Sequence, residues 1–432
     1  MRPASADDDR EYRRNGEGSG TERVTDAAIE RGKERERQPR VLVFTTVFPS
    51  PIRPLHGVFV AERLKRLARH AEVRVVAPVP RWPWRRHAVP RRVELEGLAV
   101  LHPTFHYIRG IFKSLDGVFL FLSSLAAVIE TRRDFNFDLI DAHFAYPDGF
   151  AALLLGWWFR RPVMITERGT LPSFRRGSLR RRLADWGLRR ADRVIVVARP
   201  LADLAIAAGA SPNRVVVIEN GVDTERFAPR DRTEARQRLG VTQSIRLLVS
   251  VGHLSKRKGF QRVISVLPRL LGEVPELRLA IVGGPGAEGN NRSRLERLVA
   301  DLDLRDRVIF VGARPPSEVA TWLNAADVFV LASDHEGSPN VVWEALASGR
   351  PVVASRVGDV DHMVPRFAGI VYDDPYDLDQ LAFSLATALR SRWSEKRIRA
   401  HGEAHGWDSV ARRVLVEWDA LIESDCRRRA KY

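Results

Sequence analysis

The chain has 432 residues, is 44% apolar and carries 70 Lys and Arg against 54 Asp and Glu, a net charge of +16. Its length suggests two or three domains, and its apolar fraction excludes a wholly disordered chain. The single cysteine, Cys426, excludes a disulfide scaffold and a cysteine-ligated zinc site. A charge of this size indicates one of three partners: nucleic acid, an anionic membrane surface or a phosphate-bearing substrate.

The positive charge is distributed unevenly along the chain. Residues 1–39 carry 9 basic and 10 acidic side chains, a net charge of −1. Residues 40–220 carry 29 and 15, a net charge of +14, whereas residues 221–432 carry 32 and 29, a net charge of +3. A charge kept for solubility alone would be spread evenly, so the excess indicates a partner of the first folded half.

Three segments bear on targeting and membranes. Residues 1–39 are polar and charged, which predicts a disordered leader without the apolar core of a secretory signal. Gly117–Ile129 is a stretch of 13 apolar and small residues, too short to span a bilayer, which predicts a buried helix or a segment lying in the membrane plane. At the C-terminal end, Arg427–Arg429 and Lys431 predict a short, solvated basic tail.

Short β-rich runs alternate with helical patterns along the rest of the chain. The first series of expected strands is Val41–Phe44, Val73–Ala77, Leu139–His143, Val163–Thr166 and Val194–Val197. After a turn at Asn220-Gly221, the second series is Leu247–Val251, Leu279–Gly283, Val308–Val311, Val328–Ala332, Pro351–Ala354 and Gly369–Val371. This pattern predicts an α/β fold with two Rossmann-like, doubly wound parallel sheets, whose carboxyl edges face a shared cleft.

We therefore expect a leader over residues 1–39, one domain over 40–218, a second over 219–390, and a helical segment with the basic tail over 391–432.

The most informative motif, Ser333–Gly349, follows a strand of the second domain. Ser338 followed by Pro339 predicts a helix start whose free N–H groups, from Asn340 onward, bind an anion. Carboxylates in the loop (Glu336) and on the helix (Glu344) suit ligand hydroxyls. The alternative is a solvated acidic loop.

Two further segments follow strands of the second domain. Gly252–Gly259 contains three cations, which suit a diphosphate, although a solvated basic turn is the alternative. Ile281–Gly286 is glycine-rich and allows either close approach of a ligand or a simple turn. In the first domain, His143 ends a strand, His56 and Gly57 lie in the first loop, and Arg168 follows another strand. All are expected at the cleft, although a lone histidine is often structural.

Together these residues resemble a retaining family 4 glycosyltransferase with the GT-B architecture. The resemblance runs from about Arg40 to Val416 and is strongest over Gly312–Val364, which holds W-L-x-x-A-D-V-F-V-L, the E-x7-E block and G-x-P-V-V-A-S. E-N-G-V-D lies at the domain junction. Three further motifs resemble those of enzymes of the teichuronic-acid or exopolysaccharide type: F-P-S-P-x-x-P-x-H-G-x-F-V, D-A-H-F-A-Y-P-D-G and R-G-T.

The resemblance implies the role of each domain and of single residues. The first domain takes the acceptor, and the second takes a UDP- or GDP-linked sugar as co-substrate, without a metal or other cofactor. The implied catalytic residues are His143, near the reacting carbon, Glu336, on the donor sugar, and Lys258, on the diphosphate. The implied donor-binding set is Gly57, His253, Lys258, Gly283, Arg314, Glu336, Gly337, Ser338, Asn340, Val341 and Glu344, the last of these on the ribose.

One departure from the family concerns His253, which stands where such proteins often carry arginine. A neutral histidine would neutralise less leaving-group charge, which leaves altered donor preference or reduced activity open. Asp301-Leu302-Asp303 matches an Asp-x-Asp string but is expected at a helix end, so it does not indicate a metal site.

The expected function is sugar transfer with retention of configuration, in cell-surface polysaccharide or glycolipid synthesis on a lipid-linked or saccharide acceptor. We expect a cytoplasmic protein, peripheral on the inner face of the plasma membrane. Two basic stretches, Arg81–Arg92 and Arg175–Arg193, are candidates for contact with an anionic surface. In the second, Leu179, Leu183 and Trp186 share one helical face, which predicts an interfacial helix or a packed helix with a solvated basic side.

Other readings stay open. A GT-B epimerase or phosphorylase would share the fold, and a non-catalytic nucleotide-sugar-binding subunit would share the donor site. Nucleic acid is not expected as a partner, because no aromatic–basic RNA motif or helix-turn-helix signature is found. A tandem Rossmann oxidoreductase is disfavoured because no G-x-G-x-x-G follows the first strand.

Overall fold

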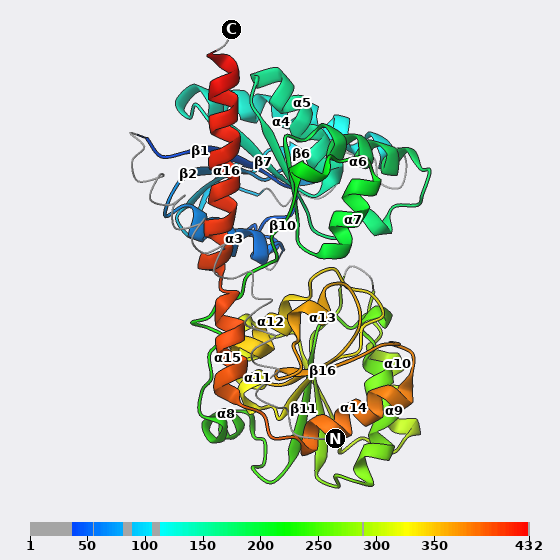
Figure 1. The fold of residues 1–432 in the computed structure, drawn as a ribbon. Helices are drawn as coiled ribbons and strands as arrows, with labels where there is room; N and C mark the ends of the chain where they lie inside the picture. The colour runs from blue at the N-terminus through cyan, green and yellow to red at the C-terminus, as the bar shows by residue number, and fades with distance from the viewer. Residues whose placement is uncertain (1–36, 55, 81–88, 106–112, 287–288, 431–432) are drawn as a thin grey trace.

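A computed structural model describes residues 37–430, apart from residue 55 and residues 81–88, 106–112 and 287–288. Residues 1–36 of the leader expected over 1–39, and most of Arg81–Arg92, therefore lie outside the described residues. The chain forms two lobes, each built around a central sheet with helices on both faces (Figure 1). The α/β class and the pair of doubly wound sheets predicted from the sequence are confirmed.

The first lobe contains an eight-stranded sheet in the order β10-β9-β8-β7-β1-β2-β5-β4. Its strands are β1 (Arg40–Phe44), β2 (Glu72–Val76), β4 (Arg92–Leu95), β5 (Leu98–Leu101), β7 (Leu139–His143), β8 (Val163–Glu167), β9 (Arg193–Val196) and β10 (Val215–Val217). A separate pair joins β3 (Val79–Pro80) and β6 (Thr104–Phe105). All neighbours in the large sheet are parallel except β4 and β5, a hairpin that the sequence reading missed together with β10.

The second lobe contains a six-stranded parallel sheet in the order β13-β12-β11-β14-β15-β16. Its strands are β11 (Arg246–Val251), β12 (Leu277–Val282), β13 (Val308–Gly312), β14 (Val328–Leu331), β15 (Val352–Ser355) and β16 (Gly369–Tyr372). All six were predicted to within two residues. Strands covered by helices on both faces are continuous apolar runs rather than alternating ones, which explains why they are easy to find in this sequence.

The helices pack on the faces of the two sheets. Those of the first half are α3 (Val58–Leu67), α4 (Asp116–Asp134), α5 (Phe150–Phe159), α6 (Leu179–Arg190) and α7 (Arg199–Ala207). Those of the second half are α8 (Arg232–Leu239), α9 (Phe260–Leu271), α10 (Arg292–Asp301), α11 (Pro316–Ala325), α12 (Asn340–Ala347), α13 (Val360–Met363), α14 (Leu378–Arg390), α15 (Glu395–Ala404) and α16 (Trp407–Arg429).

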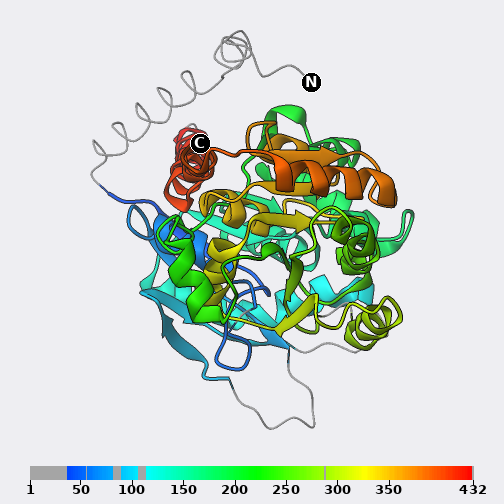
Figure 2. The same ribbon diagram turned by 90° about the horizontal axis from the view of Figure 1, so that it is seen from below.

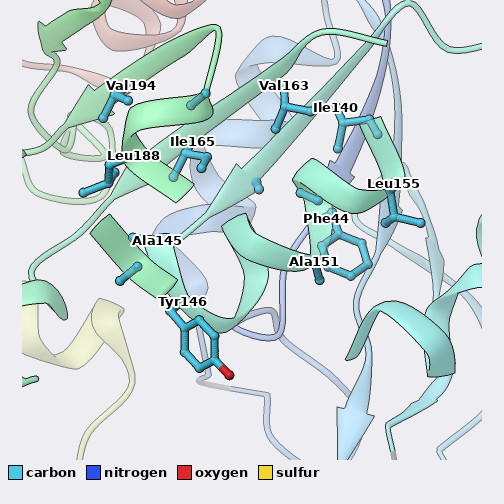
Figure 3. Close-up of a cluster of buried hydrophobic side chains, with 14 of the residues drawn as sticks. Phe44, Ile140, Ala145, Tyr146, Ala151, Leu155, Val163, Ile165, Leu188 and Val194 are labelled. Atoms are coloured by element: carbon cyan, nitrogen blue, oxygen red, sulfur yellow. The ribbon is translucent and has the colours of Figure 1, made fainter. Parts of the chain in front are cut away.

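The core of the first lobe has two parts, one on each face of its sheet. On one face, residues of α4, α5 and α6 pack against Phe44, Ile140 and Ile165 (Figure 3). On the other face, α3 packs together with α16, the last helix of the chain. After the second lobe, α16 therefore returns to the first lobe (Figure 1), and Figure 2 shows it nearly end-on at the edge of the molecule.

The structure changes the description of two single segments. Gly117–Ile129 belongs to a longer helix, so it is not too short: Lys113–Asp134, 22 residues, is long and apolar enough to cross a membrane by length and composition. Part of this helix nevertheless packs in the first core. Arg427–Arg429 is the last turn of α16 rather than a separate tail, but its side chains are exposed as predicted, and Arg428 pairs with Asp192. Lys431 lies outside the described residues.

The helix predicted to lie in a membrane interface, α6, is mainly a packed helix. Leu183 packs against the first core, and the ring of Trp186 lies 5.3 Å from the ring of Phe150. Leu179, at the start of the helix, is the member of the predicted apolar face that is exposed. The alternative reading, a packed helix with a solvated basic side, is therefore the one that fits α6.

Candidate active site

The carboxyl ends of the strands in both sheets point toward the junction between the lobes (Figure 1). Two loops meet there, one after β8 in the first lobe and one after β14 in the second. A β-carbon placed on Gly337 would lie 3.8 Å from the carbonyl oxygen of Arg168 and 4.0 Å from the α-carbon of Gly169. These are ordinary van der Waals distances, so the two loops are in contact and side chains from both lobes share one site.

Glu336 is the centre of a compact charged cluster on the second lobe. The Lys258 Nζ lies 2.7 Å from its Oε1, the Arg257 Nη1 lies 3.2 Å from its Oε2, and the Ser333 hydroxyl donates to Oε1 at 2.7 Å. Burial alone would raise the pKa of Glu336, but the Lys258 charge and hydrogen bond, aided by Ser333 and Arg257, lower that pKa below its usual value. Glu336 is therefore ionised, and it forms one ion-paired unit with Lys258.

The backbone geometry of Gly259 explains how Lys258 reaches Glu336. Gly259 has a φ of 69° and ends the short turn Lys256–Lys258 after β11. Its α-carbon lies so near the carbonyl of Ala332 that any β-carbon there would clash. A glycine is thus needed for the cationic turn to pack against the end of β14, which carries the Glu336 loop.

The helix that follows this loop, α12, begins one residue later than predicted. Its N-cap is Pro339, no side chain caps it, and the Ser338 hydroxyl is buried without a partner among the described residues. The prediction of Ser338 as N-cap is therefore wrong. The first N–H groups of a helix lack internal acceptors, and the uncapped start of α12 lies directly beside the Glu336 loop. An anion bound there would meet both the helix start and Lys258.

Glu344, one turn into α12, has the properties of a carboxylate poised between its two protonation states. Burial raises its pKa to about 7, and only the charge of Arg226 opposes that shift. Arg226 itself pairs with Asp223 at 3.2 Å, so its charge is shared. Near neutral pH, Glu344 therefore accepts or donates a hydrogen bond depending on its protonation state.

In the first lobe, His143 at the end of β7 is fully buried. The Arg168 Nε donates a hydrogen bond to its Nδ1 at 3.0 Å. Because an arginine only donates, Nδ1 must carry the lone pair and Nε2 must carry the proton. Burial lowers the pKa of His143 well below its usual value, and the charges of Arg168 and Arg63 lower it further. His143 is therefore a neutral imidazole, and its Nε2–H has no partner among the described residues.

Arg168 also connects the two lobes. Its Nη1 donates to the Asn220 Oδ1 at 2.5 Å, and the Asn220 Nδ2 donates to the Asn340 Oδ1 at 2.9 Å. A chain of hydrogen bonds thus runs from His143, through the segment between the lobes, to the first residue of α12. The sequence reading placed Arg168 at this edge but identified Asn220 only as a turn residue.

Two buried carboxylates that the sequence reading missed hold the first-lobe loops in place. Glu167 accepts hydrogen bonds from four backbone N–H groups, those of Ala145, Gly169, Thr170 and Leu171. Asp148 accepts from the backbone N–H of Thr46 at 2.8 Å, and burial raises its pKa to about 7. Glu167 lies at a strand end before R-G-T, and a buried acid followed by turn residues is a signal that could have marked it.

The remaining members of the predicted donor-binding set lie on other loops and on the first turn of α12. Gly57 (φ 75°) and Gly283 (φ 156°) each lie against backbone carbonyls of their own lobe, so the fold already needs a glycine at both positions. His253 is exposed after β11. Arg314 follows the edge strand β13 and pairs with Glu318 at 3.4 Å. Val341 is half-buried in the first turn of α12.

No group of three or more His, Cys, Asp or Glu side chains within the described residues has the geometry to hold a metal ion. The site as described is made of cations, carboxylates, one neutral imidazole and a helix start.

Comparison with known families assigns both halves of the chain. Residues 56–226 match the family model "Glycosyltransferase Family 4", and residues 231–405 match "Glycosyl transferases group 1". The two matches are adjacent, follow the order of the lobes and together cover most of the chain. The chain belongs to the family 4 glycosyltransferases of the GT-B fold.

Curated relatives of this family 4 member include D-inositol 3-phosphate glycosyltransferases. The protein of that name from Acidothermus cellulolyticus is 34% identical over 235 residues, 52% of this chain and 52% of the relative. The one from Corynebacterium glutamicum is 29% identical over 319 residues, 68% of this chain and 75% of the relative. The chain spans about half the length of the relatives from Acidothermus cellulolyticus, Geodermatophilus obscurus and Thermobispora bispora.

Solved structures show the same fold. The sucrose-phosphate synthase from Thermosynechococcus elongatus has a TM-score of 0.74 at 22% identity, covering 90% of this chain and 100% of that one. The Anabaena protein Alr3699/HepE in complex with UDP has a TM-score of 0.67 at 19% identity, covering 88% and 100%. The GT-B architecture inferred for this family 4 chain is thereby confirmed.

Proposed function

We propose that the protein transfers a sugar from a nucleoside-diphosphate-sugar to an acceptor hydroxyl, with retention of anomeric configuration. The observation that carries this proposal is the cluster of Lys258, Arg257, Ser333 and Glu336 at the open start of α12, in contact with the loop that holds His143 through Arg168. In this proposal residues 219–390 bind the donor and residues 40–218 bind the acceptor.

On the donor side, the reaction breaks the bond between the anomeric carbon and the phosphate oxygen, and the electron pair leaves with the nucleoside diphosphate. Lys258 and the α12 start would stabilise the charge that develops on that oxygen. Glu336 would hold the sugar hydroxyls, and Glu344 the ribose. Structures of the Anabaena protein, titled as complexes with UDP and with UDP-glucose, support a UDP-linked donor in this fold.

On the acceptor side, the new bond joins the acceptor oxygen to the anomeric carbon on the face that the diphosphate leaves, and the hydroxyl proton passes to the departing phosphate oxygen. His143 would orient a sugar or acceptor oxygen through its Nε2–H. Its buried, neutral and Arg168-bonded state suits a hydrogen-bond donor rather than a nucleophile. Contact between the two lobes would exclude water and limit hydrolysis of the donor.

For the acceptor, we propose a lipid-linked saccharide of cell-surface polysaccharide or glycolipid synthesis, used at the inner face of the plasma membrane. The net charge of +14 over residues 40–220 suits the phosphate of such a lipid. A second candidate acceptor is a phosphorylated cyclitol, favoured by the names of the curated relatives. Both acceptors carry phosphate, so the charge alone does not choose between them.

The test begins with UDP-, GDP- and ADP-sugars, measured for thermal stabilisation of the protein. The stabilising donor is then incubated with membrane lipid extract or with inositol 3-phosphate, and the anomeric configuration of the product is read by NMR. Release of a changed sugar without an acceptor would instead show an epimerase. Donor binding without transfer or hydrolysis under both acceptor conditions would instead show a non-catalytic subunit.

A further inference from the structure

The outer side of helix α4 is apolar, although it faces away from the first core. Leu122 is 60% exposed, Ile129 is 36% exposed, and Leu115, just before the helix, is 39% exposed. These residues are spaced by seven positions, so they lie on one stripe of the helix, two turns apart. A helix on the surface of a globular protein normally has polar residues on that stripe.

Helix α5 packs beside α4 and extends this apolar surface. Its ten residues, Phe150–Phe159, include no polar side chain except the indole N–H groups of two tryptophans. Trp157 is 77% exposed and Trp158 is 53% exposed. Among the described residues, five of the eleven exposed large apolar side chains belong to α4, to α5 or to the turn just before α4: Leu115, Leu122, Ile129, Trp157 and Trp158. We call this the α4–α5 face. Such a concentration of exposed apolar side chains is typical of an interaction surface.

Arginines border the α4–α5 face at the end where α5 finishes. A cavity of about 780 Å³ beside Trp157 is lined by two aspartates and by the five arginines Arg160, Arg161, Arg190, Arg428 and Arg429. The Arg161 Nε is buried without a partner among the described residues. Burial lowers the pKa of Arg161, and the neighbouring charges of Arg132 and Arg429 lower it further. Asp192 pairs with Arg428, and Asp425 pairs with Arg428 and Arg429, so two aspartates balance part of the charge of five arginines. An anion placed beside Arg161 would balance more of it.

We propose that the α4–α5 face docks on an anionic bilayer, with Leu122, Ile129 and the two tryptophans entering the interface and the bordering arginines binding lipid phosphates. Indole rings suit this position because one edge is apolar and the other donates a hydrogen bond. A second copy of the chain fits less well, because a two-fold interface through this face would bring the same five arginines from both copies together.

The α4–α5 face also adjoins the proposed acceptor side. The first turn of α4 is held by Tyr146, whose hydroxyl accepts from the Gly117 N–H at 2.9 Å, and Tyr146 follows His143 in the chain by three residues. Docking through this face would bring the His143 edge near the headgroups. This link to the acceptor side rests on the proposed function. The α4–α5 face is a separate candidate from Arg81–Arg92, most of which lies outside the described residues.

The test is sedimentation of the full chain with vesicles of phosphatidylcholine and phosphatidylglycerol in equal amounts, without any sugar donor. Leu122→Ser with Ile129→Ser, and separately Trp157→Ser with Trp158→Ser, should each weaken vesicle binding by about tenfold. The matched control is Leu378→Ser with Phe383→Ser, which changes two exposed apolar residues of the second lobe and should leave binding unchanged. Thermal unfolding of each variant checks that it is folded.

A second arm tests the arginines. Arg160→Gln with Arg161→Gln should reduce the preference for vesicles that contain phosphatidylglycerol over vesicles of phosphatidylcholine alone. The proposal is overturned if the wild-type chain does not bind the anionic vesicles, or if the control variant loses binding as much as the others. It is also overturned if the chain is a dimer that the same substitutions dissociate. Because no donor is present, the result does not depend on whether transfer activity is found.

Discussion

The two lobes share one architecture but use their charges differently. In the second lobe, cations are matched by nearby carboxylates: Asp327 alone pairs with Arg232, Arg236 and Arg246, and Glu336 pairs with Lys258. Many arginines of the first lobe are paired as well, for example Arg63 with Asp141, but Arg168 at the candidate site donates to two neutral groups, the His143 imidazole and the Asn220 amide. Charge at the second-lobe site is thus balanced by a carboxylate, whereas the cation at the first-lobe site orders neutral side chains.

The largest expected effect comes from breaking the matched pair in the second lobe. Lys258→Met should lower the rate of transfer about a hundredfold or more, because it removes a cation from the leaving diphosphate. Lys256→Met, two residues away and exposed, is the matched control and should change the rate little. Initial rates at saturating donor measure both. Equal losses of transfer rate in the two variants would show that the turn acts through its total positive charge and not through the position of Lys258.

The double variant Lys258→Met with Glu336→Gln separates chemistry from folding. Lys258→Met alone leaves the buried Glu336 with less compensation, so it should also lower the melting temperature. The double variant should recover stability but not activity. If it recovers both, the pair is structural.

The next effect concerns the neutral partners of Arg168. Arg168→Gln should lower kcat by about tenfold to a hundredfold, because His143 loses the donor that fixes its tautomer and the link to Asn220. Nitrogen NMR of the imidazole should then show a mixture of tautomers instead of one. Arg175→Gln, an exposed arginine of the same lobe, serves as control. An unchanged tautomer with reduced kcat would contradict the orienting role.

A smaller effect depends on pH and on Glu344. With a pKa of about 7 in the free protein, Glu344 is mostly protonated at pH 6 and mostly ionised at pH 8. If the ribose is held by the carboxylate, donor affinity should rise about tenfold across this range. Calorimetric titration of the donor at several pH values measures it, and Glu344→Gln should flatten the profile. A profile that keeps its slope in the variant would assign the titration to another group.

Through Glu344, a rise in pH should lower the free energy of unfolding, whereas it should raise the affinity for the donor. Its folded pKa lies above the ordinary value of 4.5, so between about pH 4.5 and 7 the folded state keeps a proton that the unfolded state loses. This group therefore makes unfolding easier as the pH rises through that window. In Glu344→Gln, the free energy of unfolding, measured by urea titration at several pH values, should fall less across this window.

The smallest expected effect concerns His253. His253→Arg adds an exposed cation after β11, where related enzymes often carry arginine, and should raise turnover only about two- to fivefold, because Lys258 and Arg257 already supply charge there. Steady-state rates with the preferred donor measure it. A gain as large as the loss in Lys258→Met would show that His253 limits this enzyme.

The sequence predicted the strands better than the contacts. The second-lobe strands are short apolar runs between helical patterns, so their positions followed from composition. The Ser338 cap was missed because Pro339 adopts an extended conformation and delays the helix by one residue. Lys258 and Glu336 were assigned separately, because they are 78 positions apart in the chain and only the close approach at Gly259 brings them together.

The roles of Asn220 and Glu167 depended on tertiary structure in another way. Asn-Gly reads as a turn in any protein, and only the position of α12 makes Asn220 a bridge between lobes. Glu167 is an ordinary acid in the sequence. Only the curvature of the loop after it and the position of the segment after β7 gather four N–H groups around it. These roles depend on contacts between residues far apart in the chain, so no short sequence motif predicts them.

The return of α16 to the first lobe links the order of synthesis to the order of folding. Val414 and Trp418 on α16 are buried together with Val41 and Leu139, which are made hundreds of residues earlier. While the chain leaves the ribosome, that apolar face of the first sheet therefore stays uncovered until the second lobe has been synthesised. The first domain to emerge is the last to mature, and it is the one for which a chaperone would be needed longest.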